Sequence, residues 1–147
     1  MKTMTKLTCI AAAIAAAILT SSCSKAAEDE ANIIGEWHLT GIEVPTKVEE
    51  PYGLSVYISF SEDSSFEIYE KLQEGRYRKY NGNYNLKDNV LTGTYSDDSP
   101  LNGVSYKVKT SGNTLTLTQS DAPNEVTTYI RESIPEEVRE TAIEGIQ

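Results

Sequence analysis

Acid–base chemistry in this sequence would depend on one imidazole and on scattered carboxylates. His38 is the single histidine, so it is the only imidazole that could activate a serine or cysteine nucleophile. It directly follows Trp37, and strand alternation therefore predicts that it points to the opposite, solvent-facing side. A second histidine, which a typical zinc site would need beside it, is absent from the sequence.

The carboxylates show no catalytic arrangement either. Paired Asp and Glu side chains can hydrolyse glycosides, but here they gather in turn-like and polar segments, where solvation is the ordinary role. Asp97 and Asp98, considered with Glu62 and Asp63, lack the loop spacing of a calcium site. We therefore predict a protein that is not an enzyme and that uses no cofactor and no metal.

Cys23 is the residue whose setting indicates a covalent modification. Lys2 and Lys6 form a basic start, an apolar run extends from Cys9 to Leu19, and small polar residues fill 20–22. This is the layout of a secretory signal, and its apolar run is too short for the roughly 20 residues of a spanning helix. With a cysteine at the cleavage point it resembles a bacterial lipoprotein signal, which implies lipidation of Cys23. The alternative is an ordinary signal in which Cys23 stands by chance.

The segments after the signal divide into a tether and one domain. Residues 1–22 are the predicted signal peptide, residues 23–32 an acidic tether, and residues 33–147 the folded domain. The tether carries Glu28, Asp29 and Glu30 and has no large apolar side chain. It resembles the acidic export signal of Bacteroidetes lipoproteins, which implies an outer-membrane lipoprotein exposed at the cell surface.

The charge of the chain excludes some classes of partner. The formal net charge is −9, and loss of Lys2 and Lys6 with the signal would make it two units more negative. Such a surface repels nucleic acid and anionic lipid. We therefore predict no nucleic-acid partner and contact with the membrane through the lipid anchor only.

The domain reads as a succession of short strands. In residues 54–60, for example, Leu54, Val56 and Ile58 alternate with polar or amphipathic residues, which indicates strands with one buried face. Hairpin-length links favour pairing between sequence neighbours, in a sandwich or, as we predict, an all-β up-and-down antiparallel barrel of eight strands. The expected strands are 33–43, 53–60, 65–73, 76–86, 90–97, 103–110, 114–120 and 125–132.

The C-terminal segment has a helical pattern instead. Ser133 could cap a helix, with Pro135 in its first turn and Glu136 completing a capping box. Apolar residues then recur at helical spacing, at Ile134, Val138, Ala142 and Ile146. We expect a short helix packed outside the barrel; the alternative is a frayed terminus.

Several short motifs resemble lipocalins. Gly35-Glu36-Trp37 is similar to the Gly-x-Trp that opens a lipocalin barrel, and Tyr129-Ile130-Arg131 ends the last strand where related proteins place an arginine over that tryptophan. The hairpin segments 60–66, 82–86 and 115–117 resemble those of lipocalin-like (calycin-type) lipoproteins of the Bacteroidetes kind. The resemblance implies an eight-stranded ligand-binding barrel with a short C-terminal helix.

A structural plug is the first role expected for Gly35, Trp37 and Arg131. The buried indole would close one end of the barrel, with the guanidinium stacked over its face. The alternation of the last strand does not decide whether Arg131 points inward or outward. If Val126, Thr128 and Ile130 face inward, Arg131 faces outward unless a bulge redirects it.

The barrel interior decides between two functions. In the first, an open cavity of about 300 Å³ or more binds a small apolar or amphipathic ligand such as a fatty acid, sterol or sugar. The alternative role for the same side chains is packed core. The candidate cavity residues are Leu54, Val56, Ile58, Phe66, Tyr84, Tyr95, Tyr106 and Val108.

The second function is an interaction module with a filled barrel. It would dock a partner protein or a glycan on an exposed aromatic patch. The candidate residues for that patch are Tyr52, Tyr57, Tyr69 and Tyr77.

Overall fold

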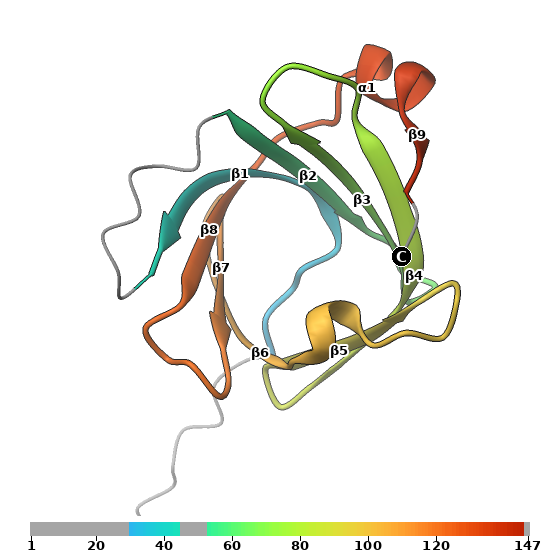
Figure 1. The fold of residues 1–147 in the computed structure, drawn as a ribbon. Helices are drawn as coiled ribbons and strands as arrows, with labels where there is room; N and C mark the ends of the chain where they lie inside the picture. The colour runs from blue at the N-terminus through green and yellow to red at the C-terminus, as the bar shows by residue number, and fades with distance from the viewer. Residues whose placement is uncertain (1–29, 45–52, 146–147) are drawn as a thin grey trace, which may run out of the picture.

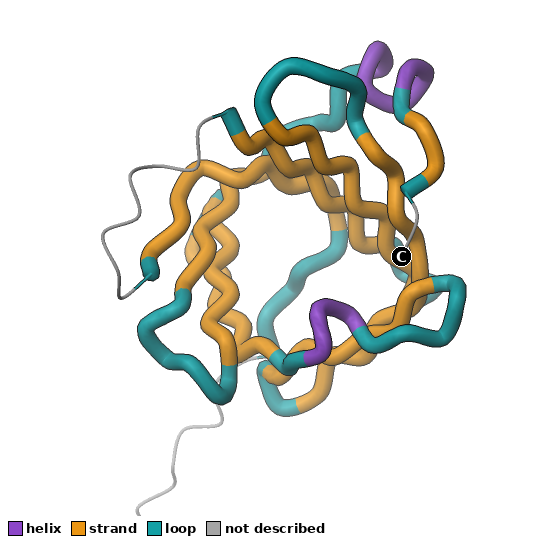
Figure 2. The backbone as a smooth tube through the Cα atoms, viewed as in Figure 1, coloured by secondary structure: helices purple, strands orange, loops and turns teal. Residues whose placement is uncertain are grey.

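Eight antiparallel strands close into a barrel, as the sequence predicted (Figures 1 and 2). The computed structural model describes residues 30–44 and 53–145. Each strand pairs with its sequence neighbours, and β1 pairs with β8 to complete the ring. The strands are β1 (Gly35–Glu43), β2 (Leu54–Phe60), β3 (Ser65–Leu72), β4 (Arg78–Lys87), β5 (Val90–Tyr95), β6 (Tyr106–Ser111), β7 (Thr114–Gln119) and β8 (Val126–Arg131).

Local sequence explains the hairpins. The β4–β5 connection is a two-residue turn in which Asp88 and Asn89 have φ values of 52° and 58°. Such positive φ angles match the twist of paired strands and are tolerated best by Asn, Asp and Gly. In β4, Gly82 has no side chain, and a Cβ there would overlap the carbonyl oxygen of Thr94 and the ring of Phe66. This glycine therefore lets β4 pass close to its neighbours.

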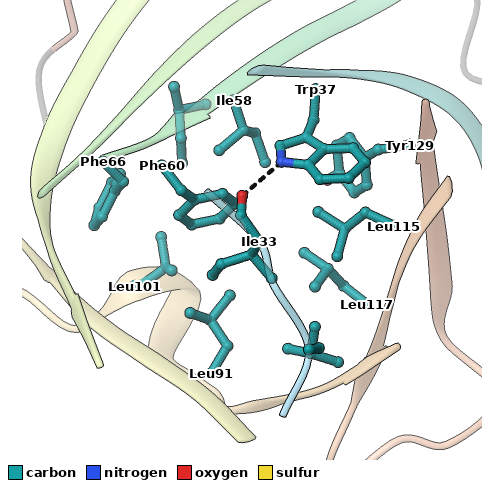
Figure 3. Packing of buried hydrophobic residues seen from close by; sticks show 13 residues of the cluster. Ile33, Trp37, Ile58, Phe60, Phe66, Leu91, Leu101, Leu115, Leu117 and Tyr129 are labelled. Carbon is teal, nitrogen blue, oxygen red and sulfur yellow. Dashed lines mark hydrogen bonds between the residues drawn. The ribbon is translucent and has the colours of Figure 1, made fainter. Parts of the chain in front are cut away.

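The segment before β1 fills one end of the barrel. Ile33 is 1% exposed and lies among the core side chains, so the chain enters the interior before it becomes a strand (Figure 3). Ala31 is also buried, and its N–H donates to Oδ1 of Asn89 over 2.7 Å. The folded part thus begins by Ala31, ahead of the boundary at residue 33 expected from the sequence.

Trp37 lies in the middle of this end of the barrel. Its side chain is fully buried, and its indole N–H donates to the carbonyl oxygen of Ile33 over 2.8 Å (Figure 3). The guanidinium carbon of Arg131 lies 4.2 Å from the indole ring centroid, and its Nη1 donates to the oxygen of Ile34 over 2.9 Å. Gly35 leaves room for this guanidinium, which a Cβ would overlap. The arginine thereby joins the first and last strands over the tryptophan.

The position of Arg131 on the inner face decides the strand parity that the sequence left open. Arg131 and Tyr129 are the register partners of Trp37 and Leu39, so they share the inner face with them. Tyr129 is also opposite the fully buried Leu115 of β7. Val126, Thr128 and Ile130 thus line the outer face of β8, and no bulge in β8 is needed. Alternation alone does not say which of two mixed faces is buried; the pairing partners decide it.

The C-terminal helix is shorter than predicted. Helix α1 spans Glu136–Thr141, its N-cap position is Pro135, and Ser133 makes no capping bond. Ala142 is extended, and the chain then forms β9 (Ile143–Glu144), parallel to the start of β4. This strand forms because β5 pairs with β4 only from Gly82 onward, which leaves the edge of β4 before Gly82 free to pair with β9. The expected apolar position at Ile146 lies outside the described residues.

This tail covers the outer face of β2 and β3. Ile134 and Val138 bury the rings of Tyr57 and Tyr69, which are only 7% and 2% exposed. Arg139 fastens the tail through an ion pair with Glu36 and, at 3.2 Å, another with Glu67.

Two of the four tyrosines proposed as an exposed aromatic patch are thus covered. Tyr57 and Tyr69 lie beneath the tail, and Tyr77 packs partly buried against their cluster. Tyr52 is outside the described residues. Because the tail supplies apolar partners for these rings, they serve as a second small core and not as an open surface.

Replacing Trp37 by Ala should lower the free energy of unfolding by about 3–5 kcal/mol, because it removes a buried aromatic ring and leaves a cavity. Urea denaturation followed by circular dichroism measures this in both proteins, because Trp37→Ala removes the single tryptophan and its fluorescence. His38→Ala, one residue away on the outer face, serves as the control and should cost about 1 kcal/mol or less. Equal losses in both variants would contradict the assignment of Trp37 to the core.

The tail offers a matched pair of isoleucines. Ile134→Ala should destabilise the protein by about 2–5 kcal/mol, since this side chain is buried against the tyrosines. Ile143→Ala should change stability by about 0.5 kcal/mol or less, because that side chain is 40% exposed. Thermal unfolding of both variants tests the packing; a neutral Ile134→Ala would show that the tail is not part of the cooperative fold.

Candidate ligand cavity in the barrel

A cavity of about 130 Å³ remains inside the barrel, on the side away from the Trp37 plug. Its wall is mostly aliphatic and aromatic, with Asn102, Tyr106 and Thr127 as polar exceptions. The side chains come from six strands and the β5–β6 connection. They are Ile58, Phe60, Phe66, Ile68, Leu91, Leu101, Asn102, Tyr106, Leu117, Thr127 and Tyr129.

The structure brings three of the predicted cavity residues together. Ile58, Phe66 and Tyr106 line the cavity. Val108 is buried in the core without lining it, and Val56, Tyr84 and Tyr95 pack against the core partly buried. Leu54 is half-buried near the start of β2 and belongs to neither set.

Other lining residues were missed for identifiable reasons. Tyr129 and Thr127 lie on the face of β8 that the assumed parity turned outward. Leu117 follows the alternation of its strand and could have been added from that signal alone. Leu101 lies between the expected strands 90–97 and 103–110, where no inward-facing residue was predicted.

This turn covers part of the barrel opening. The 3₁₀ turn η1 (Leu101–Gly103) lies over the ring of strands in Figure 1, and Leu101 is 5% exposed beneath it. Asn102 has φ 50° and ψ 13°, a left-handed conformation that asparagine tolerates well. Gly93 of β5 faces Leu101, and a Cβ at this glycine would lie 3.3 Å from the leucine Cδ2. The turn and this glycine together place an aliphatic side chain at the end of the cavity.

A short chain of hydrogen bonds marks the same end. The Tyr95 hydroxyl donates to Oδ1 of Asn102 over 3.1 Å, and Nδ2 of Asn102 donates to the Tyr106 hydroxyl over 3.0 Å. Burial raises the pKa of Tyr95 to about 12 and raises the pKa of Tyr106, despite the opposing hydrogen bond from Asn102. Both phenols are therefore neutral hydrogen-bonding groups at physiological pH.

The cavity lining offers apolar contact and a few neutral hydrogen-bonding groups. It contains no carboxylate, imidazole or amine, so no side chain there is suited to proton transfer near neutral pH. His38 lies on the outer face, stacked on Tyr57 with ring centroids 4.3 Å apart and with Nδ1 3.0 Å from Glu132.

Two further features concern metal ions and membranes. Within residues 30–44 and 53–145, no cluster of three or more His, Cys, Asp or Glu side chains is arranged to hold a metal ion. None of the helices in the described part of the chain has the length and apolar character needed to span a membrane.

The cavity volume lies between the two sequence-based expectations. It is smaller than the cavity of about 300 Å³ or more expected for a drug-sized ligand. It is nevertheless close to the size of an engineered apolar cavity of about 150 Å³ that holds a benzene molecule. The barrel is thus largely filled by its own side chains and retains room for one small ring or a short chain.

The fold agrees with what comparison with known proteins shows. Residues 33–131 match the family described as a lipocalin-like domain. A solved structure of the lipoprotein YedD from Klebsiella pneumoniae subsp. pneumoniae is similar, with a TM-score of 0.46 and 14% sequence identity over 76% of this chain and 83% of that chain. No curated protein sequence matches this chain. From the family match and the closed barrel with its interior cavity, we conclude that this chain belongs to the lipocalin-like domain family.

Proposed function

We propose that this protein binds a small apolar or amphipathic ligand in its barrel and does not transform it. The observation that carries the proposal is the cavity of about 130 Å³ inside the barrel, whose apolar wall ends in a hydrogen-bonding cluster. An apolar pocket with a few convergent polar groups is the usual form of a small-molecule site. The absence of carboxylate, imidazole and amine groups from its lining favours binding over catalysis.

The cavity volume of about 130 Å³ limits how much of a ligand can be buried in the barrel. A whole sterol or a long acyl chain exceeds a space that is close to benzene in size. A small ring or the end of a short chain fits. The sequence-based list of fatty acids, sterols and sugars therefore narrows to ligands that insert one small apolar group.

Docking of a partner protein or glycan is the competing function. The C-terminal tail covers Tyr57 and Tyr69, two of the four tyrosines on which that idea was based. It would regain support if no small molecule entered the barrel.

We further propose that the barrel is attached to the outer membrane through lipidated Cys23 and is exposed at the cell surface. The support is the signal-like segment before Cys23 and the acidic residues 28–30, which resemble those of Bacteroidetes lipoproteins. Several acyl chains would make the attachment effectively permanent, at about 0.8 kcal/mol for each buried methylene. The closed end of the barrel lies next to Ala31, where the tether joins it.

A cavity-filling substitution tests the proposed binding. Thr127→Phe should place a ring in the cavity and abolish binding of toluene or other benzene-sized probes, because Thr127 lines this space. The matched control is Thr128→Phe on the outer face of the same strand, which should bind as the parent does. Thermal shift is the readout, and a probe at a hundred times its Kd should add about 2.7 kcal/mol of stability. Failure of every probe to shift the parent would overturn the proposal and favour partner docking.

The anchor has its own test. Cys23→Ser should release the protein from the membrane fraction, since no acyl chain can then be attached through the thiol. Cell fractionation at high salt measures this, and high salt excludes electrostatic adsorption as a cause of retention. Persistence of the variant in the membrane pellet would contradict anchoring at Cys23.

A further inference from the structure

At the polar end of the cavity, the Tyr106 hydroxyl is a donor that remains for a ligand. Nδ2 of Asn102 donates to the Tyr106 oxygen, and no described residue accepts the Tyr106 hydroxyl proton. A phenol can donate one hydrogen bond while it accepts another. Because Tyr106 and Asn102 both line the cavity, this proton is available to a hydrogen-bond acceptor on a bound molecule.

Acidic side chains surround this end of the barrel. Asp97 follows β5, and Asp121 and Glu125 belong to the β7–β8 connection. Asp121 and Glu125 help to raise the pKa of Tyr106. Glu70 and Asp97 help to raise the pKa of Tyr95. A negatively charged ligand at the polar cluster would therefore have these like charges nearby and would also lose its hydration.

A cation would be attracted by the same carboxylates, but it would still lose its hydration on entering the cavity. The acidic residues lie beyond its lining, which offers a positive charge no carboxylate partner. Burying an unpaired charge in an apolar space is costly whatever its sign. A neutral molecule avoids both the repulsion and this desolvation.

The rest of the wall favours a ring. Phe60, Phe66 and Tyr129 present aromatic surface, and Leu101 closes the space beneath η1. Aromatic pairs contribute about 0.5–1.5 kcal/mol beyond the burial of their area. The length available beyond one ring is limited, so a polar substituent would lie beside Asn102 and Tyr106.

From this geometry we infer that the cavity selects a neutral, single-ring molecule carrying a hydrogen-bond acceptor, which receives the Tyr106 hydroxyl proton. The inference rests on the proposed binding function and narrows its ligand class. Tyr106 is the residue that determines polar specificity, and Leu101 limits the length of the ligand.

Four ring compounds of similar size separate these contributions. Benzamide is neutral and carries an acceptor, benzoate has the same shape with a negative charge, benzamidinium has it with a positive charge, and toluene has no polar group. Titration of the ¹⁵N-labelled protein should show benzamide binding about five- to tenfold more tightly than toluene, as expected for one added hydrogen bond. Both charged analogues should bind at least about tenfold more weakly than benzamide.

A hydroxyl deletion assigns the polar contact. Tyr106→Phe should reduce benzamide affinity to that of toluene while leaving toluene affinity unchanged. Tyr84→Phe is the matched control, because its hydroxyl donates to the oxygen of Ser61 outside the cavity lining. Both affinities should then stay as in the parent protein.

The outcomes distinguish this inference from the proposed function. Equal affinities for benzamide and toluene, insensitivity of benzamide to Tyr106→Phe, or tightest binding of either charged analogue would overturn the inference while cavity binding stands. If none of the four compounds binds the parent protein, the proposed function fails and the inference fails with it.

Discussion

Closure of the barrel by the β1–β8 pairing is the constraint on which the rest of this structure depends. An eight-stranded barrel encloses a space that inward side chains can just fill, or that can hold one small ligand. A large side chain at an inward position therefore fills the core, whereas a small one leaves space for a ligand. In this chain, large side chains such as Trp37 and Phe66 occupy most of the interior, and the remaining cavity is small.

The first and last segments of the domain close one end of this barrel, and the cavity lies toward the other end. Residues around Ile33 enter the interior, and Trp37 and Arg131 join them to β1 and β8. At the cavity, the 3₁₀ turn η1 brings Leu101 and Asn102 together, one apolar and one polar. A sealed end supplies stability, whereas a short turn between two strands can cover a cavity at little cost in backbone order.

On the outer face of the barrel, the C-terminal tail covers aromatic side chains. Tyr57 and Tyr69 point away from the barrel interior, and in an isolated barrel they would form an apolar patch. The C-terminal tail covers them with Ile134 and Val138, and the ion pairs of Arg139 with Glu36 and Glu67 hold that tail in place. Because β9 also adds to β4, the tail supports the strands without occupying the cavity.

The sequence by itself determined the number of strands, their order and the family resemblance, because alternation and turn residues are local signals. It did not determine which face of β8 is buried, since Thr127 and Thr128 are identical and the neighbouring residues are apolar on both faces. Only pairing with Leu115 and Trp37 places Tyr129 and Arg131 inside. Likewise, helical spacing predicted a longer tail helix. Ile143 instead forms a strand, because the start of β4 has a free edge with which it can pair. The cavity itself is a tertiary property, because its volume is the small remainder after side chains from six strands and one turn have packed together.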